Sequence, residues 1–348
     1  MMKKNDPSYI GQANVRQITI GSDVKIEGLV KIFLEKKALL EKLLKKTNDK
    51  YANILISNLI KNKNFLFPLN THVEKYILKN QDNFELIFNY IIFRYKFFIA
   101  GTDKINLGYP PYVLIEPVSA CNLRCPFCFQ VDKSFTKKPF MGVMKFDLFK
   151  KIIDEVDKLE IGAITLASRG EPLMHKKLIK MLEYMSTKKN IYEKKINSNA
   201  TFLSEDICHA IFKNQINQVV ISSDHYIKKD YEKLRLGSKF EEVVKNVDLL
   251  FSIRKKYYPK SITEIRISGI DNEKKLDRNK FKDFWIKRSD HVTASYPLER
   301  WDTYNNAIHE DINDPCEKLW DRMYIWFDGK VNPCDADYKS YLSFGNIS

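Results

Sequence analysis

Three of the six cysteines lie close together, at Cys121, Cys125 and Cys128, with the spacing C-x3-C-x2-C. The apolar run just before them, residues 112–117, predicts a buried strand, so the three thiols would lie on a tight loop at a strand end. Three thiolates on one loop can bind three irons of a [4Fe–4S] cluster. The fourth iron then has no protein ligand and is a place where a small molecule can bind and receive an electron.

Two ordinary alternatives apply to this loop. A structural zinc site needs a fourth Cys or His at ligand spacing, and the nearest histidine in the sequence is the remote His175. A disulfide in so tight a loop is geometrically difficult and would leave an odd thiol. Three soft ligands without a local fourth therefore favour an iron–sulfur site over both.

The elements that must position this loop begin at Tyr112, where short apolar runs start to alternate with amphipathic segments. This alternation predicts a parallel α/β sheet with right-handed crossovers, whose functional groups gather at the carboxyl ends of the strands. Six such units are too few to close an eight-stranded barrel. The expected strands are residues 112–117, 161–167, 195–198, 218–222, 262–268 and 291–295, and the expected helices are residues 146–159, 175–186, 205–213, 240–255 and 281–286.

The cysteine spacing, with Phe127 just before the last cysteine, resembles the radical SAM enzymes. The resemblance implies a partial (β/α)6 barrel in which Cys121, Cys125 and Cys128 ligate a [4Fe–4S] cluster. It also implies that the open iron chelates S-adenosylmethionine, which the cluster reduces to a 5′-deoxyadenosyl radical. An external one-electron reductant of the flavodoxin or ferredoxin type is then an expected partner.

The segment after the second expected strand, Ser168-Arg169-Gly170-Glu171-Pro172, resembles the Gly-Gly-Glu-Pro segment of that family. In the family its backbone and Glu engage the amino group of the methionine moiety, which implies this role for Gly170 and Glu171. Arg169 stands where the family has its first glycine. The ordinary alternative is a strand-to-helix turn that uses Gly and Pro.

Three more residues follow later strands at the positions of family motifs. Asn199 resembles the Asn of a turn near the cofactor, although an ordinary turn fits equally well. Ser222 resembles the Ser that binds the ribose or the methionine carboxylate. Arg235 ends a segment whose Arg can pair with a carboxylate through both arms of its guanidinium.

The C-terminal residues contain Cys316, Gly329 and Cys334 in the spacing C-x12-G-x4-C. Asp328-Gly329 predicts a hairpin turn between two short strands. This resembles the opening of a SPASM or twitch extension, so Cys316 and Cys334 are candidate ligands of an auxiliary iron–sulfur cluster. Two cysteines do not complete a cluster, and we expect either that the extension is truncated at Ser348 or that it is a β-hairpin cover without a second cluster.

The resemblance implies three parts, an N-terminal helical module (1–107), a radical SAM core (108–300) and the start of the extension (301–348). In the module, a helix is expected to begin at Ser22-Asp23 and to continue to Leu44, and residues 52–60, 73–78 and 84–98 predict further apolar helical segments. No motif in the module carries chemistry, which favours a cap on the core over a substrate or partner platform.

The net charge of +14 allows an anionic substrate, but no block of Lys and Arg is interleaved with aromatic residues as a nucleic-acid groove requires. The N-terminus lacks the apolar core of a signal peptide. The most apolar stretch, residues 84–100, contains Glu85, Arg94 and Lys96 and is too short and charged to span a membrane. We expect a cytoplasmic protein with reduced cysteines.

Together these features predict a radical SAM enzyme of the oxidoreductase or maturase type that removes a hydrogen atom from an unidentified substrate. A small sugar-like molecule is slightly favoured over a peptide or protein. Glu299 and Asp302, in a polar and aromatic segment, are candidate acid/base groups. The alternative is a non-catalytic iron–sulfur protein that transfers electrons or senses redox state, which has no need of Gly170, Glu171 and Ser222.

Overall fold

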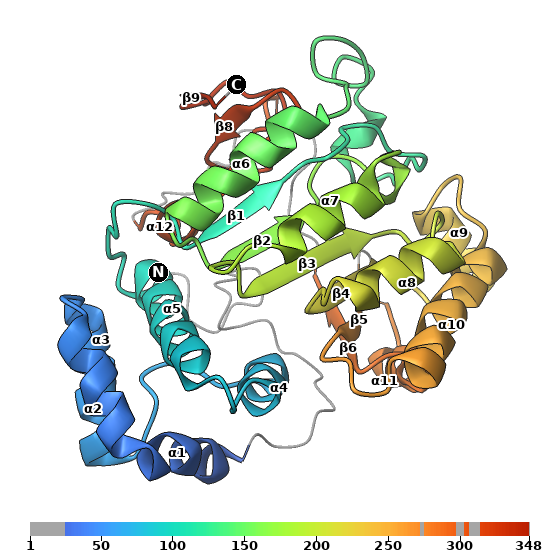
Figure 1. The fold of residues 1–348 in the computed structure, drawn as a ribbon. Helices are drawn as coiled ribbons and strands as arrows, with labels where there is room; N and C mark the ends of the chain where they lie inside the picture. Colours follow the sequence, from blue (N-terminus) through green and yellow to red (C-terminus); the bar gives the residue numbers. More distant parts are fainter. Residues whose placement is uncertain (1–24, 272–274, 297–302, 306–313, 348) are drawn as a thin grey trace.

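The computed structural model describes residues 25–271, 275–296, 303–305 and 314–347 (Figure 1). Within these residues, nine strands form one sheet in the order β6-β5-β4-β3-β2-β1-β7-β8-β9. Strands β1 to β6 lie in sequence order, and each neighbouring pair among them is parallel. The expected parallel α/β sheet is therefore confirmed. Its strands are β1 (Tyr112–Ile115), β2 (Ala163–Leu166), β3 (Glu193–Ser198), β4 (Gln218–Ser222), β5 (Glu264–Ile270) and β6 (His291–Ser295).

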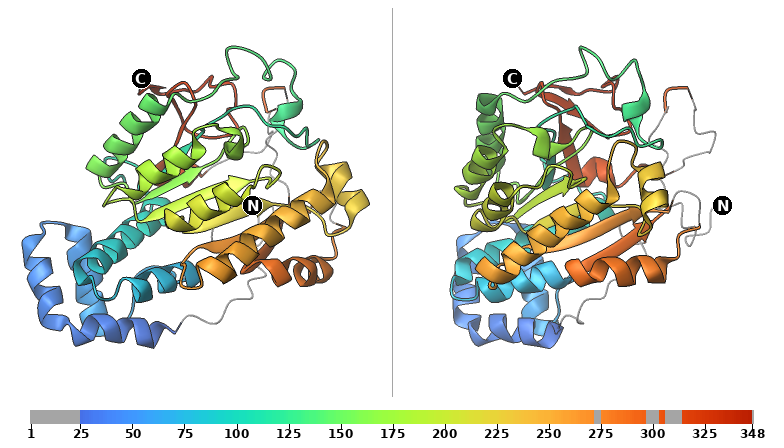
Figure 2. Two further views of the ribbon diagram at one scale, coloured as in Figure 1. Left: turned by 45° about the vertical axis from the view of Figure 1, so that its right-hand side comes forward. Right: turned by 90° about the vertical axis from the view of Figure 1, so that its right-hand side faces the viewer.

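The crossover helices pack over one face of this sheet (Figure 2). Helix α6 shows why, since Phe149, Ile152, Ile153 and Val156 recur at helical spacing and are all buried. With the side chains on one face of β1 to β6 they form the main apolar core. The helices are α6 (Phe146–Lys158), α7 (Leu178–Ser186), α8 (Glu205–Lys213), α9 (Lys228–Leu234), α10 (Phe240–Tyr257) and α11 (Arg278–Trp285).

Two of these helices differ from the expectation. Helix α7 begins at Leu178 instead of His175, because the His175 ring accepts a hydrogen bond from the Lys177 amide (3.0 Å) and contacts the Met144 carbonyl oxygen (3.0 Å). A short 3₁₀ turn, Pro172–Met174, precedes it. Helix α9 lies in a segment where no helix was expected, and it leads to Arg235.

An N-terminal group of helices forms a second apolar cluster, which also includes Ala163 at the start of β2 and Tyr192 just before β3. The group therefore packs against the edge of the sheet at which the strands begin, below the sheet in Figure 1. Its helices are α1 (Ile26–Glu35), α2 (Lys37–Lys46), α3 (Lys50–Asn62), α4 (Thr71–Lys79) and α5 (Phe84–Thr102). These helices, residues 26–102, lie in the described part of the expected module 1–107, and "helical module" below means these residues.

The first expected helix is wrong in one respect. The periodicity from Ile26 to Leu44 predicts one helix, but the chain forms α1 and α2, with a break at Lys36 (φ −107°, ψ 31°). The expected start at Ser22-Asp23 lies outside the described residues. Within the described part of the chain, no helix combines the length and apolar character that crossing a membrane requires.

The C-terminal strands extend the same sheet beyond β1. Strand β7 (Arg322–Ile325) pairs in parallel with β1, and β8 (Lys330–Asn332) pairs antiparallel with β7. The hairpin expected at Asp328-Gly329 is thus present, and Gly329 adopts the left-handed conformation (φ +85°) of its turn. Strand β9 (Gly345–Asn346) follows β8, and the short helix α12 (Lys318–Asp321) precedes β7. The strands expected in a separate extension therefore continue the core sheet.

Candidate active site

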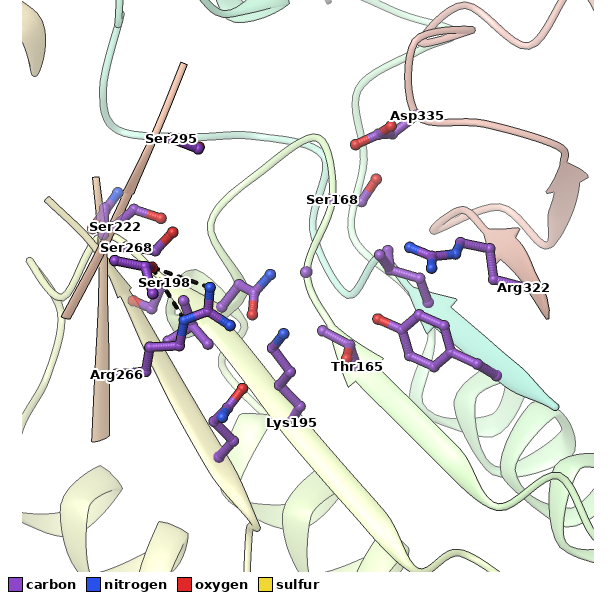
Figure 3. A pocket seen from close by; sticks show the side chains of 18 of the residues that line it. Thr165, Ser168, Lys195, Ser198, Ser222, Arg266, Ser268, Ser295, Arg322 and Asp335 are labelled. Atoms are coloured by element: carbon purple, nitrogen blue, oxygen red, sulfur yellow. Dashed lines mark hydrogen bonds between the residues drawn. The ribbon is translucent and has the colours of Figure 1, made fainter. Parts of the chain in front are cut away.

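One cavity of about 1140 Å³ lies on the face of the parallel strands opposite the crossover helices (Figure 3). Successive side chains of a strand point to opposite faces. On β5, for example, Ile265 and Ile267 belong to the apolar core, whereas Arg266 and Ser268 line the cavity. The cysteine loop, which follows β1, lines the cavity at the carboxyl ends of the strands. His72 and Arg94 of the helical module line it where the strands begin.

Every residue predicted to bind the cluster or its cofactor lines this one cavity. They are Cys121, Cys125, Cys128, Gly170, Glu171, Asn199, Ser222 and Arg235. They come from loops that are distant in the sequence, and the parallel order of β1 to β5 brings them together.

The three cysteine side chains lie on the loop that follows β1, and none of them forms a disulfide. The Cys128 amide donates to the Cys125 carbonyl oxygen (3.0 Å), and the Arg124 amide donates to the Leu236 carbonyl oxygen (2.9 Å), which hold the loop's shape. Burial raises the pKa of Cys121 to about 12, and burial also raises that of Cys125. Metal binding must therefore displace a proton from these thiols.

The thiols fit a cluster better than a single ion. Within the described residues, no three His, Cys, Asp or Glu side chains converge on a position for one metal ion. The cysteine ligands of a cube each bind a different iron, so they do not need to converge on one point. A mononuclear zinc site, in contrast, requires four ligands around one centre.

Gly170 allows the loop after β2 to lie directly against the cysteine loop. A Cβ atom at this position would lie 2.2 Å from the Val118 carbonyl oxygen and 2.4 Å from that of Ala120. The next residue, Glu171, donates its amide to the Ala120 carbonyl oxygen (2.9 Å). Glycine is therefore required here by the close approach of two backbones.

The Glu171 carboxylate is buried and accepts three hydrogen bonds from the protein. The donors are the Ser198 hydroxyl (2.7 Å), the Asn199 amide (2.8 Å) and the Leu173 amide (3.1 Å). Burial raises the pKa of Glu171, and these hydrogen bonds act against the rise. Glu171 thus joins the loops after β2 and β3, and its implied role at the cofactor's amino group is still a prediction.

Ser168, two residues before Gly170, is the most unusual residue of this loop. Its φ of 105° is rarely adopted by a residue with a side chain. Its buried hydroxyl has no hydrogen-bond partner among the described residues. A strained residue whose buried polar atom lacks a protein partner indicates a place where a bound molecule supplies one.

Asn199 and Arg235 both lie against the cysteine loop. The Asn199 side-chain amide donates to the Asn122 side chain (2.9 Å) and lies 3.8 Å from the Cys121 sulfur. The Arg235 guanidinium pairs with the Asp224 carboxylate (2.5 and 3.0 Å) and lies 3.9 Å from the Cys125 sulfur. The carboxylate partner of Arg235 thus comes from this chain, and its positive charge lies beside a thiol.

Ser222 ends β4 and lies opposite Ser268 of β5, and both hydroxyls line the cavity (Figure 3). Gln130 was not predicted from the sequence, yet its buried side chain donates to the carbonyl oxygens of Ser119 (2.7 Å) and Arg169. It therefore joins the cysteine loop to the loop after β2. The only sequence signal was its position two residues after the last cysteine of the loop.

Four predicted residues remain. Glu299 and Asp302 lie outside the described residues. Cys316 is exposed and Cys334 half-buried, and neither lines the cavity. The Cys334 sulfur accepts a hydrogen bond from the Ala336 amide (3.4 Å). The auxiliary cluster is still a prediction.

Comparison with known proteins agrees with this geometry. Residues 115–284 match the family model of the Radical SAM superfamily. One relative is a GTP 3′,8-cyclase of Desulforamulus reducens, 22% identical over 48% of this chain and 50% of that protein. Another is a tungsten-containing aldehyde ferredoxin oxidoreductase cofactor-modifying protein of Pyrococcus furiosus, 31% identical over 32% of this chain and 30% of that protein. The chain thus covers half or less of these relatives.

Two solved structures share the fold. That of anSMEcpe with bound AdoMet has 19% sequence identity and a TM-score of 0.53, over 69% of this chain and 75% of that one. That of Streptococcus suis SuiB bound to the precursor peptide SuiA has 14% identity and a TM-score of 0.50, over 82% of this chain and 81% of that one. At these identities the likeness concerns the fold alone.

Proposed function

We propose that residues 115–284, which match the family model of the Radical SAM superfamily, form a radical SAM domain. In this proposal the protein is an enzyme that uses a [4Fe–4S] cluster and S-adenosylmethionine to remove a hydrogen atom from a substrate. When bound, the cluster supplies one electron that cleaves S-adenosylmethionine to methionine and the hydrogen-abstracting 5′-deoxyadenosyl radical. The observation that carries the proposal is the shared cavity, because three thiols and the polar strand ends line one space large enough for a cofactor and a substrate.

In this proposal Cys121, Cys125 and Cys128 hold the cluster at the carboxyl ends of the strands. The Arg235 guanidinium, 3.9 Å from the Cys125 sulfur, favours the thiolate form that ligation requires. Asn199 holds the same loop from the other side through Asn122.

Polar groups that line the cavity and are available for hydrogen bonds indicate which residues would contact S-adenosylmethionine. The Ser168 hydroxyl, which has no hydrogen-bond partner in the described part of the chain, and the Ser222 hydroxyl both line the cavity near the strand ends. Gly170 brings its backbone close to the cysteine loop, where carbonyl oxygens can accept hydrogen bonds from an ammonium group. The Glu171 carboxylate then acts mainly by fixing the turn that contains Asn199.

The other side of the cavity is bounded by the helical module. His72 and Arg94 line the cavity where the strands begin, and both contact Glu193 of β3. The module thus helps to separate the cavity from water, which radical chemistry requires. We also propose that the sheet is the partial (β/α)6 barrel of the family and that residues 301–348 belong to a SPASM- or twitch-like extension. An external flavodoxin or ferredoxin supplies the electron in the cytoplasm in this proposal.

A non-catalytic electron-transfer protein is a weaker proposal for this chain. Such a protein needs a cluster near its surface, but it does not need a large polar cavity next to the cluster. The cavity of about 1140 Å³ therefore favours an enzyme.

Anaerobic reconstitution with iron and sulfide, followed by dithionite and S-adenosylmethionine, tests the proposal. We expect 5′-deoxyadenosine from the wild-type protein and none above background from Cys125→Ala. Cys208→Ala is the matched control, because Cys208 is fully buried in the apolar core and does not line the cavity. Equal product from wild type and Cys125→Ala would contradict the proposal.

A further inference from the structure

Basic side chains project into the cavity from three strands of the sheet (Figure 3). Lys195 comes from β3, Arg266 from β5 and Arg322 from β7. Arg266 and Lys195 approach the same space from strands that are separated only by β4, and Arg322 faces them from the other side of the view. They lie between the helical module and the cysteine loop.

The three cations differ in their partners. Arg322 pairs with Asp321 through both arms of its guanidinium (2.6 and 3.0 Å). Arg266 donates to the neutral hydroxyl of Thr293 (3.0 and 3.3 Å). No hydrogen bond or ion pair to another described residue holds the Lys195 ammonium group.

The carboxylates nearest the start of the strands do not neutralise these cations directly. Glu193 accepts hydrogen bonds from Tyr90 (2.8 Å) and Arg94 (3.3 Å) of the helical module and also contacts His72. Glu264 pairs with Lys75 (3.0 Å) and His291 (3.2 Å). The partners of these carboxylates come from the module and, for Glu264, also from His291 of β6. Glu193 attracts Lys195 and Glu264 attracts Arg266 only through space, and burial outweighs both attractions.

Cations that lack a hydrogen-bonded anion are unfavourable in a confined cavity. Charged groups withdrawn from water are normally paired. Burial, together with the neighbouring Arg266 and Arg322, lowers the pKa of Lys195 to about 7. An anion between the two side chains would remove this repulsion and provide an acceptor for their N–H groups.

We propose that Lys195 and Arg266 form an anion subsite in the cavity, which binds a phosphate or carboxylate group of the substrate. The assignment to a substrate rests on the proposed function. Ser198 is at the end of β3 that faces the cofactor residues, and Lys195 comes three residues earlier in the same strand. At about 3.3 Å per residue, Lys195 is therefore about 10 Å farther from the cysteine loop than Ser198 is. A substrate anchored there by its anionic group would extend its other end toward the cysteine loop.

The cofactor's own carboxylate is a less suitable occupant. The predicted cofactor residues Asn199 and Ser222 lie at the carboxyl ends of β3 and β4, on the cysteine side of the cavity. Lys195 and Arg266 lie nearer the start of their strands, on the side of the helical module. The subsite and the cofactor residues therefore mark two different regions of one cavity.

Isothermal titration of the reconstituted full chain with sulfate and with succinate tests the subsite, against sodium chloride of equal ionic strength. We expect saturable binding to the wild-type protein that Lys195→Met weakens about tenfold or more, the loss typical of one charge-assisted hydrogen bond. Arg266→Gln provides a second, independent variant with the same expectation. Lys189→Met is the matched control, because Lys189 is exposed and lies outside the cavity.

A response to sulfate alone assigns a phosphate-like group, and a response to succinate alone assigns a carboxylate. Absence of binding to the wild-type protein, or equal binding to wild type, Lys195→Met and Arg266→Gln, would overturn the subsite. Because the titration measures no turnover, failure to form 5′-deoxyadenosine would contradict the proposed function while leaving this result unchanged. Unaltered S-adenosylmethionine binding by Lys195→Met is also expected, and its loss would reassign the cations to the cofactor.

Discussion

Arg169 and Glu116 form a buried ion pair that joins the loop after β2 to the end of β1. The Arg169 Nε atom donates to the Glu116 carboxylate (2.7 Å), and a second guanidinium nitrogen contacts its other oxygen. The third nitrogen donates to the Tyr338 carbonyl oxygen (2.7 Å), and the guanidinium lies 4.4 Å from the Trp326 ring. Arg169 therefore attaches the C-terminal segment to the core.

Replacing Arg169 with Met should destabilise the protein by about 3–5 kcal/mol, because Glu116 would be left as an uncompensated buried carboxylate. Burial already raises the pKa of Glu116, and Arg169 acts against that rise. The free energy of unfolding in guanidinium chloride measures the loss. The double variant Arg169→Met with Glu116→Gln should lose less than the sum of the single variants.

Lys188→Met is the control for removing a charge from an ion pair. Its partner Asp154 is half exposed, so water can solvate the carboxylate that remains. Such pairs contribute about 0–1 kcal/mol. Equal losses in Arg169→Met and Lys188→Met would contradict the structural role of Arg169.

Gly170→Ala should reduce bound iron after reconstitution without unfolding the chain. The new Cβ would lie 2.2 Å from the Val118 carbonyl oxygen, so the loop after β2 must move away from the cysteine loop. Iron and sulfide content per chain measure the effect, with circular dichroism as the check on folding. Gly28→Ala is the matched control, because no atom lies within 4 Å of its added Cβ and alanine favours helix α1. Full iron content in Gly170→Ala would contradict the close contact.

The strands and the cysteine loop could be predicted from the sequence because their signals are local. Buried apolar runs such as Val113–Ile115 alternate with amphipathic helices, and the cysteines lie within one loop. The parallel order then places Gly170, Asn199 and Ser222 near that loop without further information, since strand ends of a parallel sheet share one edge.

The remaining features depend on contacts between distant segments. Glu116 is 53 positions from Arg169, and Tyr338 is 169 positions from it, so no spacing pattern in the sequence joins them. The pairing of β7 with β1 is equally remote. Lys195 was not singled out from the sequence, because only the folded sheet shows which face of β3 it occupies.

Glu193→Gln should weaken the attachment of the helical module and reduce stability by about 1.5–3 kcal/mol near neutral pH, because Arg94 loses a partly buried charged partner. Burial alone would raise the pKa of Glu193, but Arg94, His72 and Tyr90 outweigh burial and lower it to about 2. A lowered folded-state pKa contributes stability above the unfolded value of 4.5, and this stability is lost as the pH falls toward 2.

The difference in unfolding free energy between wild type and Glu193→Gln should therefore shrink as the pH falls through this window. Denaturation at several pH values measures it, with the exposed Glu183→Gln as control. A difference that does not change with pH would show that Glu193 acts through packing alone.

Sulfate binding should weaken as the pH rises through about 7, since Lys195 loses its proton there and sulfate keeps its charge. The other charged groups that line this part of the cavity are Arg266, Arg322, Glu193, Glu264 and His291.

The wild-type protein without sulfate should also gain stability between pH 7 and 10.5, because the unfolded chain then binds the proton that folded Lys195 has released. Lys195→Arg should keep sulfate binding at about pH 9, because a guanidinium does not lose its proton there, and Lys195→Met should show neither effect. Titration with sulfate measures the affinity, and denaturation measures the free energy of unfolding, each at about pH 6 and pH 9. A wild-type sulfate affinity that is equal at the two pH values would contradict this role of Lys195.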